Sequence, residues 1–152
     1  DIYTVATKDI SMILLIVAGA GALKQIFTDS GVSLVLAEGI QSWDMHPLIL
    51  AWLITAVIRI AVGSATVAGL TTAGILAPLV PTLDVDPNLL VLSIGAGSLV
   101  FSHFNDGGFW MCKEYFNLSI KDTLKSWTLM ETIVAVAGLG GVLLLDLLLK
   151  VL

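Results

Sequence analysis

The sequence predicts an all-α, polytopic membrane protein with a re-entrant helical hairpin and broken transmembrane helices. Of its 152 residues, 57% are hydrophobic and 12% are charged, whereas a soluble domain carries about 25% charged residues. The mean hydropathy is +1.00. Long apolar segments are interrupted by glycines and polar residues, as in helices that break inside a bilayer. We expect residues 1–152 to form a single transmembrane unit.

Charge and cysteine content argue against other classes of protein. The formal net charge is −5, and no basic stripe with interleaved aromatic residues is present, which argues against nucleic-acid binding. The single Cys112 has no partner for an intramolecular disulfide and fits no metal-ligand spacing, so we interpret it as apolar packing. The chain begins at Asp1 without a signal peptide or lipidation motif, and we expect further segments of the same protein upstream.

Residues 9–43 are expected to form a helical hairpin. Their first apolar run, Ile10 to Ala22, is only about 20 Å long as a helix, and an amphipathic arm follows it. Non-helical backbone is tolerated at membrane depth only where protein or a water-filled cavity covers it. The hairpin tip at Gly19, Gly21 and Lys24 is therefore predicted to line a cavity, with Lys24 near a substrate anion. The alternatives are a surface amphipathic helix and an interfacial lysine.

Residues 47–80 predict a broken transmembrane helix. This apolar stretch is longer than the about 20 residues that a bilayer crossing needs, and Arg59, Gly63, Ser64 and Thr66 lie near its middle. A buried arginine costs about 2.5–3.5 kcal/mol on insertion scales, so it must face protein, water or an anion. Unwinding would also present a helix N-terminus near Thr66, which attracts anions. We predict that these four residues bind a carboxylate.

An alternative remains for the same segment. Arg59 can pair with a neighbouring carboxylate or extend to the headgroups, and the two hydroxyls can bond back to helix carbonyls. In that case the break has a structural role only.

Residues 88–112 predict an interrupted transmembrane helix. The apolar run is too short to span before it reaches Ser102, His103, Asn105 and Asp106, so these polar residues are expected within membrane depth. We predict that Ser102 and Asn105 bind substrate, and that His103 and Asp106 take up and release a proton. The alternative is a simple turn, because Asn-Asp-Gly-Gly is strong turn chemistry.

The remaining residues predict an interfacial loop over 113–127 and a transmembrane helix over 128–150. Tryptophans near the segment ends are typical of side chains at headgroup level. Glu131 and Asp146 lie near the ends of the last helix and are expected to face water, and His46 is expected in a loop.

A family likeness is carried by residues 19–25, 50–67, 73–78 and, above all, 94–110, which read IGAGSLVFSHFNDGGFW. These stretches resemble the C-terminal part of the gluconate:proton symporter family, the gluconate permeases of the ion-transporter superfamily. The resemblance implies a secondary active transporter with broken helices, and not an enzyme. It implies import of gluconate or a related small hydroxy-carboxylate with protons, by a multi-pass protein of the bacterial inner membrane. The family also has an arginine at the position of Arg59.

The resemblance implies no cofactor, with the proton as coupling ion and sodium as an open alternative. The implied partners are a small anionic carboxylate, the lipid bilayer and missing N-terminal segments of the same transporter, and a homo-oligomer stays an open alternative. D-serine or another small amino acid is an alternative substrate. A membrane structural or assembly subunit without transport activity is an alternative function. An intramembrane enzyme is disfavoured, because the sequence has no recognisable metal pair or serine dyad.

Overall fold

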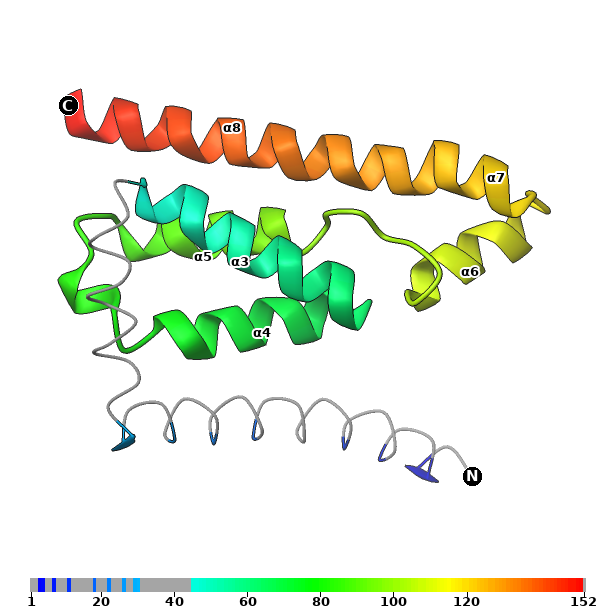
Figure 1. Ribbon diagram of the computed structural model, residues 1–152, viewed down its shortest axis with the longest axis horizontal. Helices are drawn as coiled ribbons and strands as arrows, with labels where there is room; N and C mark the ends of the chain where they lie inside the picture. The colour runs from blue at the N-terminus through cyan, green and yellow to red at the C-terminus, as the bar shows by residue number, and fades with distance from the viewer. Residues whose placement is uncertain are drawn as a thin grey trace.

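The computed structural model describes residues 45–151 and a few isolated positions upstream, namely residues 3, 4, 7, 11, 18, 22, 26, 29 and 30. The regular structure within this described part is entirely helical (Figure 1). An all-α fold class is thereby confirmed for it. Most of the predicted hairpin over 9–43 lies outside the described residues. Its predicted tip at Gly19, Gly21 and Lys24 lies wholly outside them.

The apolar stretch after residue 46 forms two helices, α3 (Pro47–Val62) and α4 (Ala65–Leu76). Helix α3 ends at Gly63, whose φ of +77° is left-handed and whose N–H donates to the Arg59 carbonyl at 2.8 Å. Such a residue commonly closes a helix. Ser64 then starts α4, because its Oγ accepts from the N–H of Val67 at 3.3 Å. The interruption thus lies where the sequence predicted it.

The two helices do not continue in one direction. Leu48, at the start of α3, and Leu76, at the end of α4, belong to the same core cluster, and the helices pack against each other (Figure 1). The chain therefore reverses at Gly63 and forms the α3–α4 hairpin in place of one broken helix over 47–80. At 1.5 Å per residue the helices are about 24 and 18 Å long. Each is shorter than the about 30 Å hydrocarbon core.

The next stretch is interrupted as the sequence predicted. A 3₁₀ turn, η1 (Val80–Thr82), leads to α5 (Pro87–Gly97), and α6 (Gly107–Tyr115) follows. Asp86 and Asp106 cap the two helices through their side chains. Residues 98–106, the connecting segment, form no helix. Together α5, the connecting segment and α6 run alongside the last helix (Figure 1).

The region predicted as an interfacial loop over 113–127 is mostly helical. After α6, Ser119 caps a new helix by accepting from the N–H of Asp122 at 3.2 Å. This helix runs through α7 (Ile120–Thr123) and a π-helical turn, η2 (Leu124–Thr128), into α8 (Leu129–Val151). Its charged residues at this end lie on an exposed face, so they do not interrupt it.

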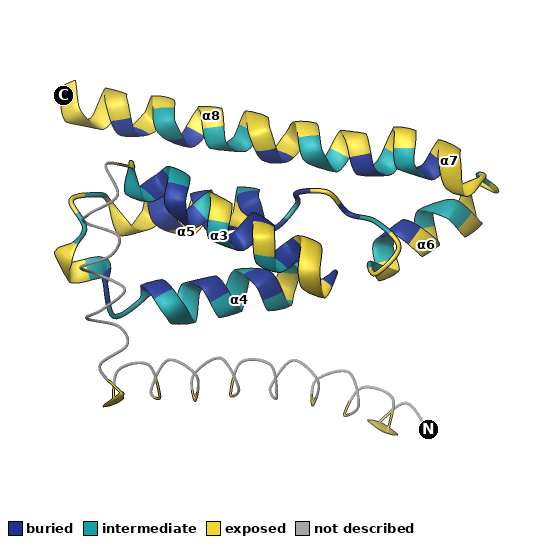
Figure 2. Ribbon diagram, in the orientation of Figure 1, coloured by how far each residue is buried: buried dark blue, intermediate teal, exposed yellow. Residues whose placement is uncertain are grey.

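The continuous helix from Ile120 to Val151 has 32 residues, and among the described residues it is the one helix long and apolar enough to cross a membrane. Its length is about 48 Å, which exceeds the hydrocarbon core. The outward side of α8 is exposed (Figure 2). That side is rich in large apolar residues, including Ile133, Val136, Leu144 and Leu148.

Helices α3, α5 and α8 pack into a core that holds the connecting segment in place. A Cβ atom at Gly97 of α5 would lie 2.5 Å from the carbonyl oxygen of Trp52 in α3, so these backbones approach closely. Ser93 donates to the carbonyl of Leu48 at 2.5 Å. The indole N–H of Trp52 donates to the carbonyl of Ala135 at 3.0 Å. Direct bonds therefore tie α3 to both α5 and α8.

Two expectations about water-facing acidic residues are wrong. Asp146 is only 7% exposed, and it lies 3.2 Å from His46 Nε2 and 2.9 Å from Lys150 Nζ. His46 does lie outside the helices, but it also caps α3 through Nδ1. Glu131 is half-buried. Burial follows from helix spacing, because both acidic residues fall on the side of α8 that packs on the core.

Candidate functional site

The centre of the candidate site is an ion pair between the α3–α4 hairpin and the start of α6. Arg59 lies in the last turn of α3 and is 2% exposed. Its Nη2 atom is 2.5 Å from Oδ2 of Asp106, the N-cap residue of α6. Arg59 therefore pairs with a carboxylate, as in the alternative considered from the sequence.

The Asp106 carboxylate has two further hydrogen-bond donors. The hydroxyl of Ser102 donates to Oδ2, and the N–H of Gly108 donates to Oδ1 at 2.9 Å. Ser102 is itself held by η2, the turn before α8: Trp127 Nε1 donates to Ser102 Oγ at 2.9 Å, and Thr128 Oγ1 donates to the Ser102 carbonyl. Hydrogen bonds of this kind favour the charged form of a carboxylate. Asp106 is thus fixed in position as an anion.

Asn105 joins the connecting segment to the hairpin. Its Nδ2 donates to the carbonyl of Ile60 at 2.9 Å and to that of Ala61 at 3.4 Å. These are among the last carbonyls of α3, which lack partners within the helix. A Cβ atom at Gly63 would lie 2.3 Å from the Asn105 carbonyl oxygen, so only glycine leaves room there. The two polar interruptions therefore meet.

Within the described part of the chain, the guanidinium of Arg59 keeps two nitrogen atoms unpaired after it binds Asp106. Its Nε and Nη1 atoms are buried and have no hydrogen-bond partner among the described residues. A buried charged group with unpaired donors is costly. A second anion beside Arg59 would satisfy these donors, which is the chemistry of a carboxylate site.

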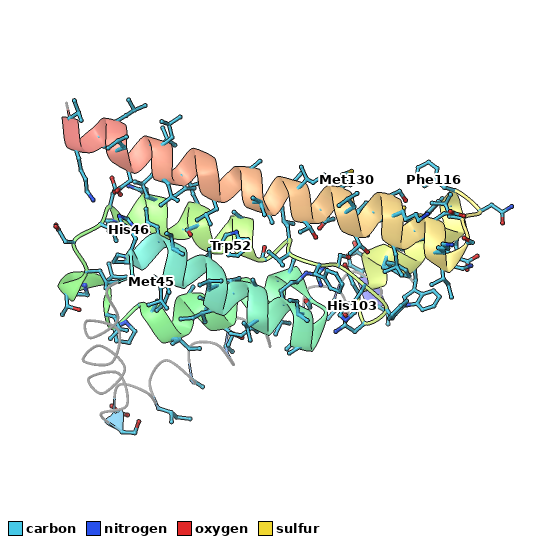
Figure 3. The ribbon with its side chains drawn as sticks, turned by 45° about the horizontal axis from the view of Figure 1, so that its top comes forward. Met45, His46, Trp52, His103, Phe116 and Met130 are labelled. Carbon is cyan, nitrogen blue, oxygen red and sulfur yellow. The ribbon has the colours of Figure 1, made fainter. Side chains whose placement is uncertain are left out.

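The other predicted residues lie nearby with different surroundings. The hydroxyl of Ser64 is occupied as a helix cap, and Thr66 is exposed in the first turn of α4. The ring of His103, which is labelled in Figure 3, contacts the rings of Phe101 and Phe104, with ring centres 5.5 and 5.9 Å away.

The structure does not join the side chains of His103 and Asp106. The Nδ1 atom of His103 is buried without a partner within the described part of the chain. Its contact with Asp106 runs through the backbone, where the Asp106 N–H donates to the His103 carbonyl at 2.9 Å. A direct proton exchange between the two side chains is therefore not set up in this arrangement.

A family model described as GntP family permease matches residues 1–148. The chain belongs to the GntP permease family. This membership confirms the resemblance seen in the sequence, and it identifies a membrane protein.

Relatives in this family have similar sequences over nearly the whole chain. A high-affinity gluconate transporter of Escherichia coli K12 is 52% identical over 97% of this chain and 34% of its own length. A gluconate permease of Bacillus subtilis is 52% identical over 97% of this chain and 33% of its own. A Gnt-II system L-idonate transporter of E. coli K12 is 47% identical over 96% of this chain and 33% of its own length. The chain spans about a third of the length of these relatives. No solved structure matches it.

The turn before α8 and the first residues of α8 also contribute to this site, although no site residue was predicted there. From the sequence, Trp127 is one of the tryptophans expected at headgroup level, and no site role is predicted for Thr128 or Thr132. The hydroxyl oxygen of Thr132 accepts from the N–H of Phe101 at 3.2 Å, and Phe101 itself has a φ of +51°. A detectable signal was the spacing of Thr128, Glu131 and Thr132, which places three polar side chains on one side of an apolar helix.

Proposed function

We propose that this chain forms part of a proton-coupled secondary active transporter that imports gluconate or a related small hydroxy-carboxylate. The observation that carries the proposal is the buried Arg59 guanidinium, which holds Asp106 through Nη2 and leaves Nε and Nη1 unpaired. The names of the relatives, gluconate transporters and permeases together with an L-idonate transporter, support a sugar acid as substrate. In this proposal the protein is a carrier and requires no cofactor.

The substrate carboxylate binds beside Arg59, where it satisfies the unpaired donors. A sugar acid also has several hydroxyl groups, which need both donors and acceptors. The exposed Asn105 and the turn at Gly63 and Ser64 lie next to the ion pair and can provide them. Thr66 follows at the N-terminus of α4, where helix N–H groups favour negative charge.

The site is completed by parts of the protein beyond residues 45–151. The hairpin tip at Gly19, Gly21 and Lys24 is proposed to form one wall of the cavity. Because the chain spans only about a third of the length of its relatives, further transmembrane segments are proposed to cover the rest. The short α3–α4 hairpin and the exposed apolar side of α8 suit a multi-pass protein of the bacterial inner membrane.

Uptake of labelled gluconate by the full-length protein in proteoliposomes tests the proposal. Removing one partner of a buried ion pair typically costs about 3–5 kcal/mol of stability, so loss of Arg59 alone would confuse folding with binding. The variant Arg59→Gln with Asp106→Asn removes both charges together. We expect it to insert and fold but to lose uptake at least about tenfold, because one charge-assisted carboxylate contact is worth about 1.5–3 kcal/mol.

A matched control removes an ion pair that lies away from the site. Lys113 and Glu114 form an ion pair at 2.8 Å in which Lys113 is partly buried and Glu114 is 74% exposed, and changing both to glutamine should leave uptake unchanged. Competition by L-idonate and not by D-serine would support a sugar acid as substrate. Undiminished uptake by the double variant at the Arg59 pair would refute the proposed site.

A further inference from the structure

Glu131 lies one turn after Thr128, on the side of the last helix that faces the connecting segment. Its neighbours on that side are Thr128, which donates to the Ser102 carbonyl, and Thr132, which accepts from the Phe101 N–H. Glu131 is half-buried, and the connecting segment that its neighbours bind is the one that brings Asp106 to Arg59. Glu131 forms no hydrogen bond with the described residues.

Few other charges face Glu131 from the helices packed on α8. Arg59 is the one charged residue of α3, and α5 has none. The nearest titratable group of the connecting segment besides Asp106 is His103, whose ring contacts two phenylalanine rings. The charged residues before α8, namely Lys121, Asp122 and Lys125, are exposed. Arg59 is therefore the positive charge shared by the two carboxylates.

The charges in this group require a proton when an anion binds. Ionised Arg59, Asp106 and Glu131 together carry one net negative charge. A substrate carboxylate would raise this to two negative charges around one buried guanidinium, and nearby like charges favour the protonated form of a carboxyl group. One proton taken up by the group restores the original net charge. Substrate binding and proton uptake are thus coupled through Arg59.

The two carboxylates are not equivalent as proton acceptors. Asp106 is held by Arg59, Ser102 and Gly108, so protonating it would break contacts that position the connecting segment. Glu131 has no such donors, and its place in an apolar helix tolerates the neutral form. We infer that Glu131 carries the proton that enters with the substrate, and that Asp106 remains the fixed counter-ion of Arg59. This inference rests on the proposed function.

In the proposed cycle a proton from the outer solution binds a carboxyl oxygen of Glu131 when the substrate carboxylate binds Arg59. Both move inward together, and Glu131 releases the same proton once the substrate has left. No bond other than that to the proton is made or broken. This role differs from the proton transfer by His103 and Asp106 that the sequence alone predicted.

The test uses Glu131→Gln in the full-length protein, reconstituted in proteoliposomes with labelled gluconate and a pH-sensitive dye inside. We expect exchange of internal for external gluconate to stay within about twofold of wild type, because the neutral side chain mimics the protonated state. Accumulation driven by an inward proton gradient should fall at least tenfold, and gluconate-dependent acidification should vanish. Asp106→Asn should lose both exchange and accumulation.

Two further variants separate proton binding from a structural role. Glu131→Asp retains a titratable carboxyl, so it should recover accumulation with a shifted pH profile. Glu114→Gln removes an acidic side chain that is 74% exposed, and it should behave as wild type. Proton-driven accumulation by Glu131→Gln at the wild-type level would overturn the inference, as would loss of exchange in that variant at normal expression. Wild-type uptake of gluconate without proton movement would instead overturn the proposed function, and this inference with it.

Discussion

Replacing Gly63 by alanine tests the contact on which the site geometry depends. A Cβ atom at this position would lie 2.3 Å from the carbonyl oxygen of Asn105, 2.5 Å from its Cγ and 2.6 Å from its carbonyl carbon. Two of these atoms are backbone, so no side-chain rotation relieves the overlap. The φ of +77° adds to the difficulty, since residues other than glycine seldom adopt it.

The structure gives the size of the effect. A left-handed conformation costs an L-residue about 1–2 kcal/mol, and overpacking a close contact typically costs about 1–3 kcal/mol more. We therefore expect Gly63→Ala to lower the free energy of unfolding by about 2–5 kcal/mol. If the connecting segment moves instead, Asn105 loses its bonds to α3, and Asp106 withdraws from Arg59. Transport would then fall even in protein that remains folded.

Thermal unfolding of the purified full-length protein and gluconate uptake in proteoliposomes measure the two effects. The matched control is Gly107→Ala, which lies at the start of α6 beside the same segment and has nothing within 4 Å of the added Cβ. We expect the control to unfold and transport as wild type does. If Gly63→Ala matched this control in both assays, the close approach of the two interruptions would be disproved.

Two other substitutions probe the packing around the site. Gly97→Ala places a Cβ 2.5 Å from the carbonyl oxygen of Trp52, so α3 and α5 must separate. We expect the free energy of unfolding to fall by about 1–3 kcal/mol, and thermal unfolding measures this loss. Trp127→Phe keeps an aromatic ring but removes the N–H donor to Ser102 Oγ. Loss of this bond should cost about 0.5–1.5 kcal/mol of stability and raise the KM for gluconate uptake, because Ser102 in turn holds Asp106.

Each of these two predictions can be contradicted by a specific result. Gly95→Ala in the same helix has open space around the added atom, and equal stability of Gly95→Ala and Gly97→Ala would show that α3 and α5 are not in close contact. An unchanged KM in Trp127→Phe would show that the indole has no part in positioning the acidic side chain.

Several local features could be predicted because they depend on residues close together in the chain. The break after α3 follows from glycine at 63 and a capping serine at 64, and the interruption before α6 follows from the Asn-Asp-Gly-Gly turn with Asp106 as cap. Such signals act over three or four residues, so no knowledge of the fold is needed to recognise them. The cost of burying Arg59 likewise indicated an anionic partner before any partner was known.

The direction of the chain after Gly63 was decided by packing. The hydropathy pattern of the sequence is the same for one interrupted helix and for two antiparallel helices. Only the hairpin brings Leu48 and Leu76 into the same buried core cluster. The charges over 113–127 suggested a loop, but an exposed helix side accommodates them equally well.

The sequence by itself determined that this protein is helical, apolar and interrupted at two polar points, because composition and capping residues act locally. The tertiary structure decided that the two points meet, that Asp106 pairs with Arg59, and that Glu131 shares the core-facing side of the last helix with Thr128 and Thr132, without hydrogen-bond donors from the described residues. These outcomes depend on distances between segments far apart in the chain. Such distances are set by how α3, α5 and α8 fit together, and helix periodicity alone does not specify that fit.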